Sequence, residues 1–410
     1  MKLTKFDYWF LAGIFLLNLA LKLFRLNSPA EVYFDEGAAY IPAARGYLQG
    51  NFDLNFEHPP LAKLFMSLGI LVFGDNPWGW RIPEVLVGSL GVVFIYLLAK
   101  RLFGGNFTPI LASLFLTFEF SWFVNSRIGT IEIYLATFSL AASFFFWNFF
   151  KEEKLKYSTL AGIFFGLAIA AKWSGVFLLI FLGIYYLWYK RKKLTGAFIR
   201  FTTTVLITAL VCLGSYGFYL TAHSFTNLAN LQIKMAKYHL QEVPKKEKAR
   251  SVRGVGSTYS YLQVYHPSLW VFNPIFPYYG ESIGERVKSV LFLFNPALFW
   301  GSLAVILISL KRLTKEKEKL FLVVAFTSFW LPWLFSPRFS LSYYLLGVMP
   351  FGILLLVKLI REKFKEWNFF ITGFVVSVIA LFFFYYPLLT AVSVHRWYFR
   401  ILTGTAGLGP

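Results

Sequence analysis

Two adjacent carboxylates, Asp35 and Glu36, follow the first apolar segment of the chain, in the stretch EVYFDEGAAYIPAARGYLQGNFDLNFEHPPLAKLF at positions 31–65. Near the end of the same stretch, Glu57 and His58 precede a Pro-Pro pair. A positioned carboxylate can accept the proton that an attacking hydroxyl loses in a transition state. The stretch therefore supplies candidate general bases beside an apolar boundary.

Isolated charged residues also stand at the ends of later apolar segments. They are Lys63, Arg81, Arg127, Glu132, Lys172 and Arg338. Ionisable groups at membrane depth are costly, so they tend to face a cavity or a partner. Cations stabilise the charge that builds on a leaving group, and the planar arginine side chain can hold phosphate oxygens bidentately. Carboxylates and cations that converge are typical of a site where phosphate leaves while a hydroxyl is deprotonated.

Each residue also has a structural interpretation. Asp35 and Glu36 could complement the dipole of a helix over 36–50, and Pro59-Pro60 could fix the first turn of a helix. Arg81 could extend to lipid headgroups. Arg127 could pair with Glu132, and Lys172 could mark an interfacial turn.

The elements that position these residues are predicted to cross a membrane. The 410 residues are 57% hydrophobic and only 15% charged, whereas soluble domains contain about 25% charged residues. The formal net charge of +20 is explained by basic residues that orient a membrane protein in the bilayer, so we expect no nucleic-acid partner. The one cysteine excludes a disulfide framework.

Apolar runs predict an all-α polytopic protein with about 11 spans, each of roughly 20 residues. The predicted spans are 7–24, 80–100, 106–125, 131–150, 157–171, 173–189, 198–221, 288–310, 320–335, 340–360 and 368–389. Basic clusters follow alternate span ends, as in KRKK at 190–193 and REKFK at 361–365. The positive-inside rule then places the N-terminus in the cytoplasm and the C-terminus outside.

This orientation divides the chain into four predicted regions. An N-terminal transmembrane module covers 1–221 and includes a first outer loop at 25–79. A long outer loop covers 222–287, four spans fill a C-terminal region at 288–390, and a basic-aromatic outer tail covers 391–410. The candidate residues are predicted to meet on the outer face.

Ordered motifs along nearly the whole chain resemble the dolichyl-phosphate-mannose protein mannosyltransferase family, which has the GT-C glycosyltransferase architecture. The motifs are VYFDE at 32–36, EHPPLAKLF at 57–65, WRIPEVLVGSLGVVFIYLLAKRLFG at 80–104, SRIGTIEIYLATF at 126–138, GLAIAAKWSGVFLL at 166–179, HPSLWVFNPIFPYY at 266–279, NPALFWG at 295–301, and LPWLFSPRFSLSYYLLGVMP at 331–350. Ala62 and Glu132 replace the usual Gly and Asp. The family's Tyr-His-Tyr after the conserved Arg reads Tyr343-Tyr344-Leu345 here. Because 222–287 is too short for the MIR domain of eukaryotic members, a bacterial or archaeal plasma-membrane enzyme is expected.

The resemblance implies transfer of a sugar, mannose by analogy, from a polyprenyl-phosphate carrier to Ser/Thr hydroxyls of exported polypeptides. Asp35 takes the role of base in a direct displacement that inverts the anomeric centre. Glu36, Glu57 and His58 are expected to orient the base, sugar or acceptor. The expected substrate-binding set also includes Lys63, Arg81, Arg127, Glu132, Lys172, Arg338 and Tyr343.

The resemblance implies no metal requirement. The residues nevertheless leave open a Mg²⁺ or Mn²⁺ ion held by Asp35, Glu36 and Glu57, because oxygen ligands suit both ions.

Two other functions are considered from the sequence. A GT-C transferase could use the same donor with a lipid A, glycolipid or polysaccharide acceptor. A transporter would show Gly- or Pro-broken spans at mid-membrane, whereas the isolated charges here gather at one predicted face.

Overall fold

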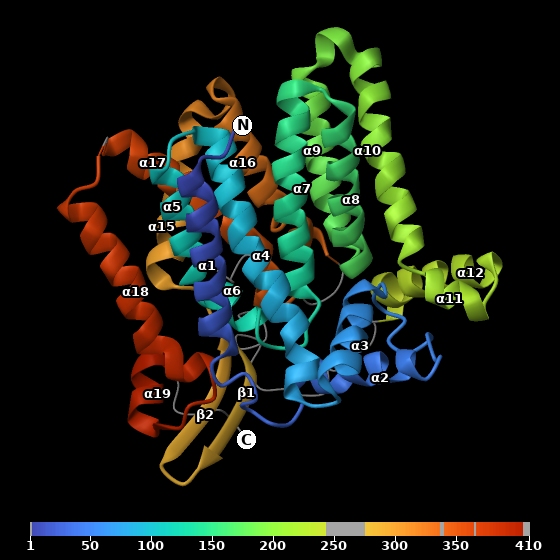
Figure 1. Ribbon diagram of the computed structural model, residues 1–410, viewed down its shortest axis with the longest axis vertical. Helices are drawn as coiled ribbons and strands as arrows, with labels where there is room; N and C mark the ends of the chain where they lie inside the picture. The colour runs from blue at the N-terminus through green and yellow to red at the C-terminus, as the bar shows by residue number, and fades with distance from the viewer. Residues whose placement is uncertain (1, 243–274, 337–339, 365, 405–410) are drawn as a thin grey trace.

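The computed structural model describes residues 2–242, 275–336, 340–364 and 366–404, and Figure 1 shows them as a helical bundle. The N-terminal half contains α1 (Lys5–Leu23), η1 (Glu36–Tyr40), α2 (Ile41–Leu48), α3 (Leu61–Phe73), α4 (Pro77–Phe103), α5 (Phe107–Thr117), α6 (Phe120–Asn125), α7 (Glu132–Glu152), α8 (Leu155–Ala171), α9 (Gly175–Tyr189), η2 (Arg191–Lys193), α10 (Leu194–Gly214), α11 (Gly217–Ala222), α12 (Phe225–Lys237) and η3 (Tyr238–Glu242). The rest contains β1 (Phe276–Ile283), β2 (Arg286–Phe292), α15 (Pro296–Ser309), η5 (Leu310–Lys315), α16 (Lys317–Ser328), η6 (Leu331–Phe335), η7 (Ser342–Val348), α17 (Met349–Lys363), α18 (Phe369–Leu389), β3 (Val394–His395) and α19 (Arg396–Thr403).

Helix α7 is the centre of the bundle, because 94% of the residues in its most hydrophobic stretch are buried inside the protein. It packs against α4 on one side and α8 on the other. Gly88 and Gly91 of α4 allow the close approach of α7, since a Cβ on Gly88 would lie 3.1 Å from Ile133 and one on Gly91 would lie 3.0 Å from Thr137. In the peripheral helices α1, α10 and α18, only 17–22% of the residues in the corresponding stretch are buried, so apolar side chains face outward.

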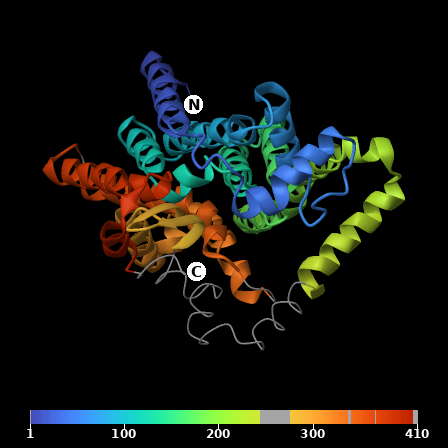
Figure 2. The ribbon, with the colours of Figure 1, turned by 90° about the horizontal axis from the view of Figure 1, so that it is seen from below.

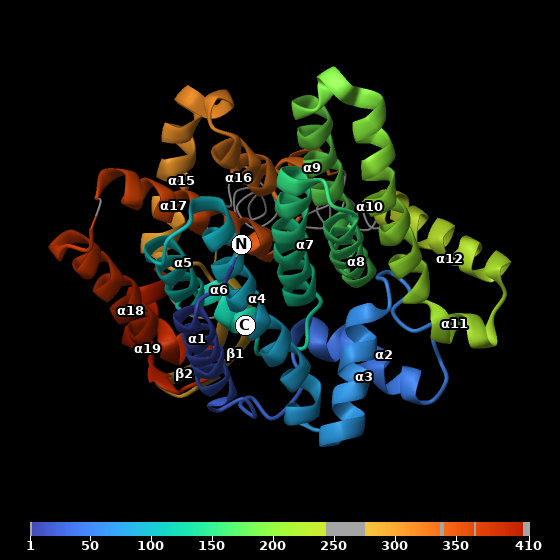
Figure 3. The same ribbon diagram turned by 45° about the horizontal axis from the view of Figure 1, so that its top comes forward.

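The elements that do not resemble spans gather at one end of the bundle. In Figures 1 and 3, α2, α3, α11, α12, α19 and the β1–β2 hairpin all lie at the end opposite the α9–α10 connection. Seen from that end in Figure 2, the α11–α12 segment lies beside α2 and α3. An aromatic contact joins the two segments, with the Phe52 and Phe218 rings 6.2 Å apart. This end of the molecule carries the candidate site.

Within the described residues, seven helices are long and apolar enough to cross a membrane. Shorter apolar helices cover Leu61–Phe73, Phe107–Thr117, Leu155–Ala171, Gly175–Tyr189 and Pro296–Ser309. The mostly helical membrane fold is confirmed. The number of spans and the placement of the termini stay predictions.

The predicted spans 106–125 and 198–221 have different boundaries in the structure. The span 106–125 breaks into α5 and α6, because the Glu119 carboxylate accepts a hydrogen bond from the Trp122 amide and begins a new helix. The span 198–221 ends at Gly214, before the separate short helix α11.

The prediction of a helix from residue 288 is wrong. Residues Arg286–Phe292 form β2, which pairs antiparallel with β1 and β3, so the part of the chain that the structure describes contains a three-stranded sheet among its helices. Hydropathy alone could not separate an apolar strand from a span here. The helix begins at Pro296, where the Asn295 side chain accepts from the Ala297 amide and acts as the N-cap.

Candidate active site

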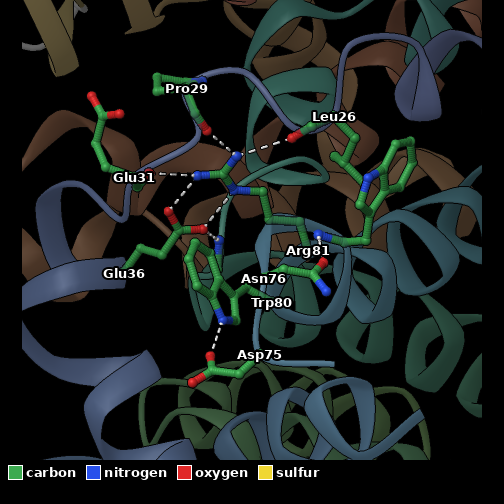
Figure 4. A network of polar contacts seen from close by, with 10 residues as sticks. Leu26, Pro29, Glu31, Glu36, Asp75, Asn76, Trp80 and Arg81 are labelled. Atoms are coloured by element: carbon green, nitrogen blue, oxygen red, sulfur yellow. Dashed lines mark hydrogen bonds and ion pairs between the residues drawn. The ribbon is translucent and has the colours of Figure 1, made fainter. Parts of the chain in front are cut away.

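A buried ion pair holds the loop between α1 and η1. The Arg81 side chain on α4 donates from Nε to Glu36 Oε1 at 2.9 Å and from Nη2 to Glu36 Oε2 at 2.8 Å. Both side chains are 0% exposed. The remaining Arg81 donors reach three backbone carbonyls of the loop, those of Leu26, Pro29 and Glu31, at 2.7–3.0 Å. Figure 4 shows the guanidinium enclosed by these acceptors.

This network changes the predicted roles of Glu36 and Arg81. Glu36 Oε1 also accepts from the Gly129 amide at 2.8 Å, so both carboxylate oxygens are engaged. All five guanidinium N–H groups have acceptors, and Arg81 is fully buried. The structure therefore contradicts Glu36 as a catalytic group and Arg81 as a phosphate ligand or headgroup anchor. Together they position the loop that carries Asp35.

Arg127 has a second structural role. Its Nη1 donates to the carbonyls of Lys22 and Phe24 at 2.9 and 2.7 Å, and its Nη2 donates to the Arg25 carbonyl at 3.0 Å. These carbonyls close the C-terminal end of α1, where a cation complements the helix dipole. Both the predicted phosphate contact and the alternative pairing with Glu132 are wrong for Arg127, because its guanidinium is turned to α1.

A cavity of about 520 Å³ lies at the same end of the bundle. This volume falls within the range of pockets that bind small molecules. Among the described residues, its titratable lining consists of Asp35, Tyr40, Glu57, His58, Glu132, Lys172, Tyr238, His239, Tyr343 and Tyr344. The structure thus brings six of the predicted residues to one hollow, namely Asp35, Glu57, His58, Glu132, Lys172 and Tyr343. Arg338 lies outside the described residues.

Asp35 is held by backbone strain and an aromatic cluster. The preceding residue, Phe34, has a φ of +52°, which is unusual for a bulky side chain. Its ring packs against Phe276, Tyr278 and Tyr343 at centroid distances of 5.1–5.7 Å. The Tyr343 hydroxyl lies 3.5 Å from Asp35 Oδ2. Strain of this kind persists where the surroundings fix the conformation, so the cluster determines where the Asp35 carboxylate lies.

Asp35 stands at the N-cap of η1, but its side chain makes no capping hydrogen bond. The helix-cap interpretation therefore does not account for its carboxylate.

Lys172 and Glu132 form the charged pair of the cavity wall. Lys172 Nζ lies 2.9 Å from Glu132 Oε1, and the two side chains are 8% and 4% exposed. The same ammonium lies 3.9 Å from the centroid of the Tyr344 ring. A smaller hollow lined by Phe177, Phe329 and Trp333 adjoins the cavity. The two share four lining residues, Glu132, Lys172, Tyr343 and Tyr344. The Lys172 cation therefore stands where the main cavity meets a smaller hollow lined by aromatic residues.

Glu57 and His58 reach the cavity on a loop whose backbone is hydrogen-bonded to the Lys63 side chain. Lys63 Nζ donates to the carbonyls of Asn55 and His58 at 2.6 and 2.8 Å. Burial lowers the pKa of Lys63 to about 7. Lys63 does not line the cavity, so the structure contradicts its predicted substrate contact and gives it a role in shaping the loop.

Sequence reasoning missed the contribution of η3. Tyr238 and His239 line the cavity, and His239 Nε2 lies 2.7 Å from the Glu57 carbonyl oxygen. These residues lie in the predicted outer loop 222–287, in a stretch that carried none of the motifs. The amphipathic pattern of α12, directly before η3, could have indicated this contribution, because such a helix packs one face on another element.

The residues present do not assemble the metal site that the sequence left open. Within the part of the chain that the structure describes, no group of three His, Cys, Asp or Glu side chains is placed to hold a metal ion. Glu36 is unsuited as a ligand because both of its oxygens bind Arg81. Asp35, Glu36 and Glu57 therefore do not form a shared ligand set.

Comparisons with known proteins show which sequences and folds the chain resembles. A family model described as dolichyl-phosphate-mannose-protein mannosyltransferase matches residues 57–216. The polyprenol-phosphate-mannose–protein mannosyltransferase of Corynebacterium glutamicum is 24% identical over 383 residues, covering 77% of this chain and 72% of that protein. The enzyme of that name from Mycolicibacterium smegmatis is 26% identical over 150 residues, covering 31% of this chain and 29% of its own length.

Two solved structures have related folds. The Saccharomyces cerevisiae protein O-mannosyltransferase Pmt1–Pmt2 complex bound to its sugar donor matches with a TM-score of 0.80 at 12% identity, covering 99% of this chain and 93% of that one. ArnT from Cupriavidus metallidurans bound to undecaprenyl phosphate matches with a TM-score of 0.59 at 16% identity, covering 86% and 60%. Residues 57–216 therefore match the dolichyl-phosphate-mannose-protein mannosyltransferase family model, and the chain as a whole has the GT-C fold.

Proposed function

We propose that this protein transfers a hexose from a polyprenyl-phosphate carrier to Ser/Thr hydroxyls of polypeptides. The single observation that carries the proposal is the cavity in which Asp35 and Lys172 both take part, beside the smaller hollow lined by aromatic residues. The donor is half lipid and half sugar phosphate, and it requires such a junction. The names of the curated relatives support mannose and a protein acceptor.

The proposed reaction is one direct displacement. The acceptor hydroxyl loses its proton to Asp35, and its oxygen bonds to the anomeric carbon on the face opposite the phosphate. The bond from that carbon to the phosphate oxygen breaks, and the phosphate leaves with the electron pair. The anomeric centre inverts, so no covalent enzyme intermediate is needed. This differs from retaining glycosidases, which use a second carboxylate as nucleophile.

Lys172 stabilises the departing phosphate. Of the four cations predicted for this task, Arg81 and Arg127 are engaged with backbone and Glu36, and Arg338 lies outside the described residues. Lys172 is the described one that lines the cavity. Glu132 holds its ammonium in place at 2.9 Å. A preorganised cation aimed at developing charge is among the largest contributions to catalysis.

The cavity is proposed to face the extracytoplasmic side of a plasma membrane. The N-terminus and the α9–α10 connection, which carries the basic residues Arg191–Lys193, lie at the other end of the bundle in Figure 1. Basic connections favour the cytoplasmic side. Translocated polypeptides would then meet the cavity as they emerge.

The direct test is transfer by purified protein in lipid vesicles that contain polyprenyl-phosphate mannose and a Thr-containing peptide. We expect mannosylated peptide from the wild type and none from Asp35→Asn at equal protein level. Mass spectrometry of a deletion strain identifies the class of acceptor molecule. Lost Ser/Thr hexose on secreted proteins supports a protein acceptor, whereas intact glycoproteins with altered lipid A, glycolipid or polysaccharide would refute it.

A further inference from the structure

The loop 55–58 is held between two elements that are far apart in the sequence. From α3, Lys63 donates to the carbonyls of Asn55 and His58. From the other side, the Lys234 ammonium of α12 lies 3.9 Å from the centroid of the Phe56 ring. The Tyr238 ring of η3 packs edge-on to Phe56 at 5.6 Å. We call this arrangement the clamp.

His239 completes the clamp at the cavity wall. Its Nε2 lies 2.7 Å from the Glu57 carbonyl oxygen, and because a carbonyl can only accept, Nε2 must carry the proton. Its ring centroid is 5.5 Å from that of His58. Asn55, with a φ of +51°, donates from Nδ2 to Glu57 Oε2 at 3.1 Å. The position of Glu57 is therefore fixed at its backbone by η3 and at its carboxylate by Asn55.

Contacts place Asp35 between the clamp and Lys172. On one side, Asp35 lies near Tyr343, whose ring is 4.9 Å from Tyr344, which in turn contacts Lys172. On the other side, η1 leads from Asp35 to Tyr40, whose ring is 6.0 Å from His58. A base that takes a proton from one substrate and promotes attack on another belongs between the two binding sites.

We propose that the clamp forms the acceptor subsite, in which Glu57 and His239 recognise the polypeptide beside the accepting hydroxyl. This inference rests on the proposed function and adds the location and preference of the acceptor. Lys172 and the smaller hollow occupy the donor end, so the acceptor binds at the end made by the clamp. Since Glu57 brings a carboxylate to this end of the cavity and no described Lys or Arg lines it there, the subsite disfavours an acidic neighbour of the accepting residue.

The test measures transfer from polyprenyl-phosphate mannose to three peptides that differ only in one residue beside the Thr, namely Lys, Ala or Asp. We expect the wild type to show a KM for the Asp peptide at least tenfold above that for the Lys peptide. Glu57→Gln should bring this ratio close to one. Equal KM values for all three peptides with the wild type would overturn the preference.

A His239 series separates acceptor binding from overall structure. His239→Ala should raise the peptide KM about tenfold, which corresponds to about 1.4 kcal/mol, and leave the donor KM unchanged. His239→Gln should restore most of the loss, because its amide nitrogen can replace Nε2 as a donor to the Glu57 carbonyl. The matched control is His223→Gln, which lies before α12, stacks on Tyr219 and does not line the cavity.

The outcomes are distinguishable. A raised peptide KM with an unchanged donor KM supports the subsite. A raised donor KM, or a lower kcat with both KM values unchanged, refutes it while the proposed function stands. If His239→Ala does not fold, the His239→Gln variant and the three-peptide series with the wild type still test the acceptor subsite. Wild-type protein that modifies no peptide would refute the proposed function and the subsite with it.

Discussion

Substitution of Glu36 by Gln tests whether the two adjacent acids have separate roles. An amide oxygen in the place of Oε1 would keep the hydrogen bonds from Arg81 Nε and the Gly129 amide. An amide NH₂ in the place of Oε2 would face Arg81 Nη2, which now lies 2.8 Å from that oxygen, and both groups are donors. The variant therefore loses one charge-assisted bond and leaves a guanidinium in a site that is 0% exposed without its counter-ion.

Removing one partner of a buried ion pair costs about 3–5 kcal/mol. The carbonyls of Leu26, Pro29 and Glu31 still accept from the guanidinium, so we expect the lower part of this range. The assay is the fraction of detergent-solubilised protein that stays monodisperse after heating, measured across temperature. Glu36→Gln should show a lower midpoint. Asp35→Asn should keep the wild-type midpoint and lose transfer.

The matched control is Glu281→Gln on β1. Its carboxylate pairs with Lys288 at 3.1 Å, and the two side chains are 40% and 38% exposed. Exposed pairs contribute about 0–1 kcal/mol, so the midpoint should not move. A Glu36→Gln protein with wild-type stability and no transfer would refute the reasoning, because Glu36 would then act in the chemistry rather than in the fold.

Three further predictions concern single cations. Arg127→Met should lower the thermal midpoint, because the α1 carbonyls lose charged hydrogen bonds that each contribute about 1.5–3 kcal/mol; an unchanged midpoint would exclude this capping role. Lys172→Met should reduce kcat for transfer roughly 100-fold, and a wild-type rate would remove Lys172 from the phosphate site. Burial lowers the pKa of Lys63 to about 7, so the unfolded chain binds the extra proton above pH 7. The free energy of unfolding should therefore rise from pH 7 to about 10 in the wild type and lose that component of its slope in Lys63→Met, as measured by denaturant titration; equal slopes in both proteins would contradict the shift.

Much of the architecture could be predicted from hydropathy. The predicted spans 7–24, 80–100 and 131–150 correspond to α1, α4 and α7, because long apolar runs with charged ends leave few alternatives. The prediction failed for β2, where an apolar run pairs with a neighbouring strand. Pairing depends on a partner elsewhere in the chain, and composition does not show it.

For the candidate site, the sequence predicted which residues take part but not which partners they contact. Residue types in the motifs pointed to Asp35, Glu57, Glu132 and Lys172, and the structure places all four at one cavity. Whether an ionisable residue faces that cavity or a partner could not be predicted. The Arg81 partner lies 45 positions away, and the bond between His239 and the Glu57 carbonyl spans 182 positions. Such pairings are decided by tertiary packing.

The position of a bound polyprenyl phosphate tests the central claim most directly. An experimental structure of the protein with this lipid should show the phosphorus within about 5 Å of Lys172 Nζ, the Asp35 carboxylate across the cavity from the phosphate, and the chain leaving past Phe177 and Trp333. A phosphate bound at another opening, remote from both Lys172 and Asp35, would contradict the proposed site.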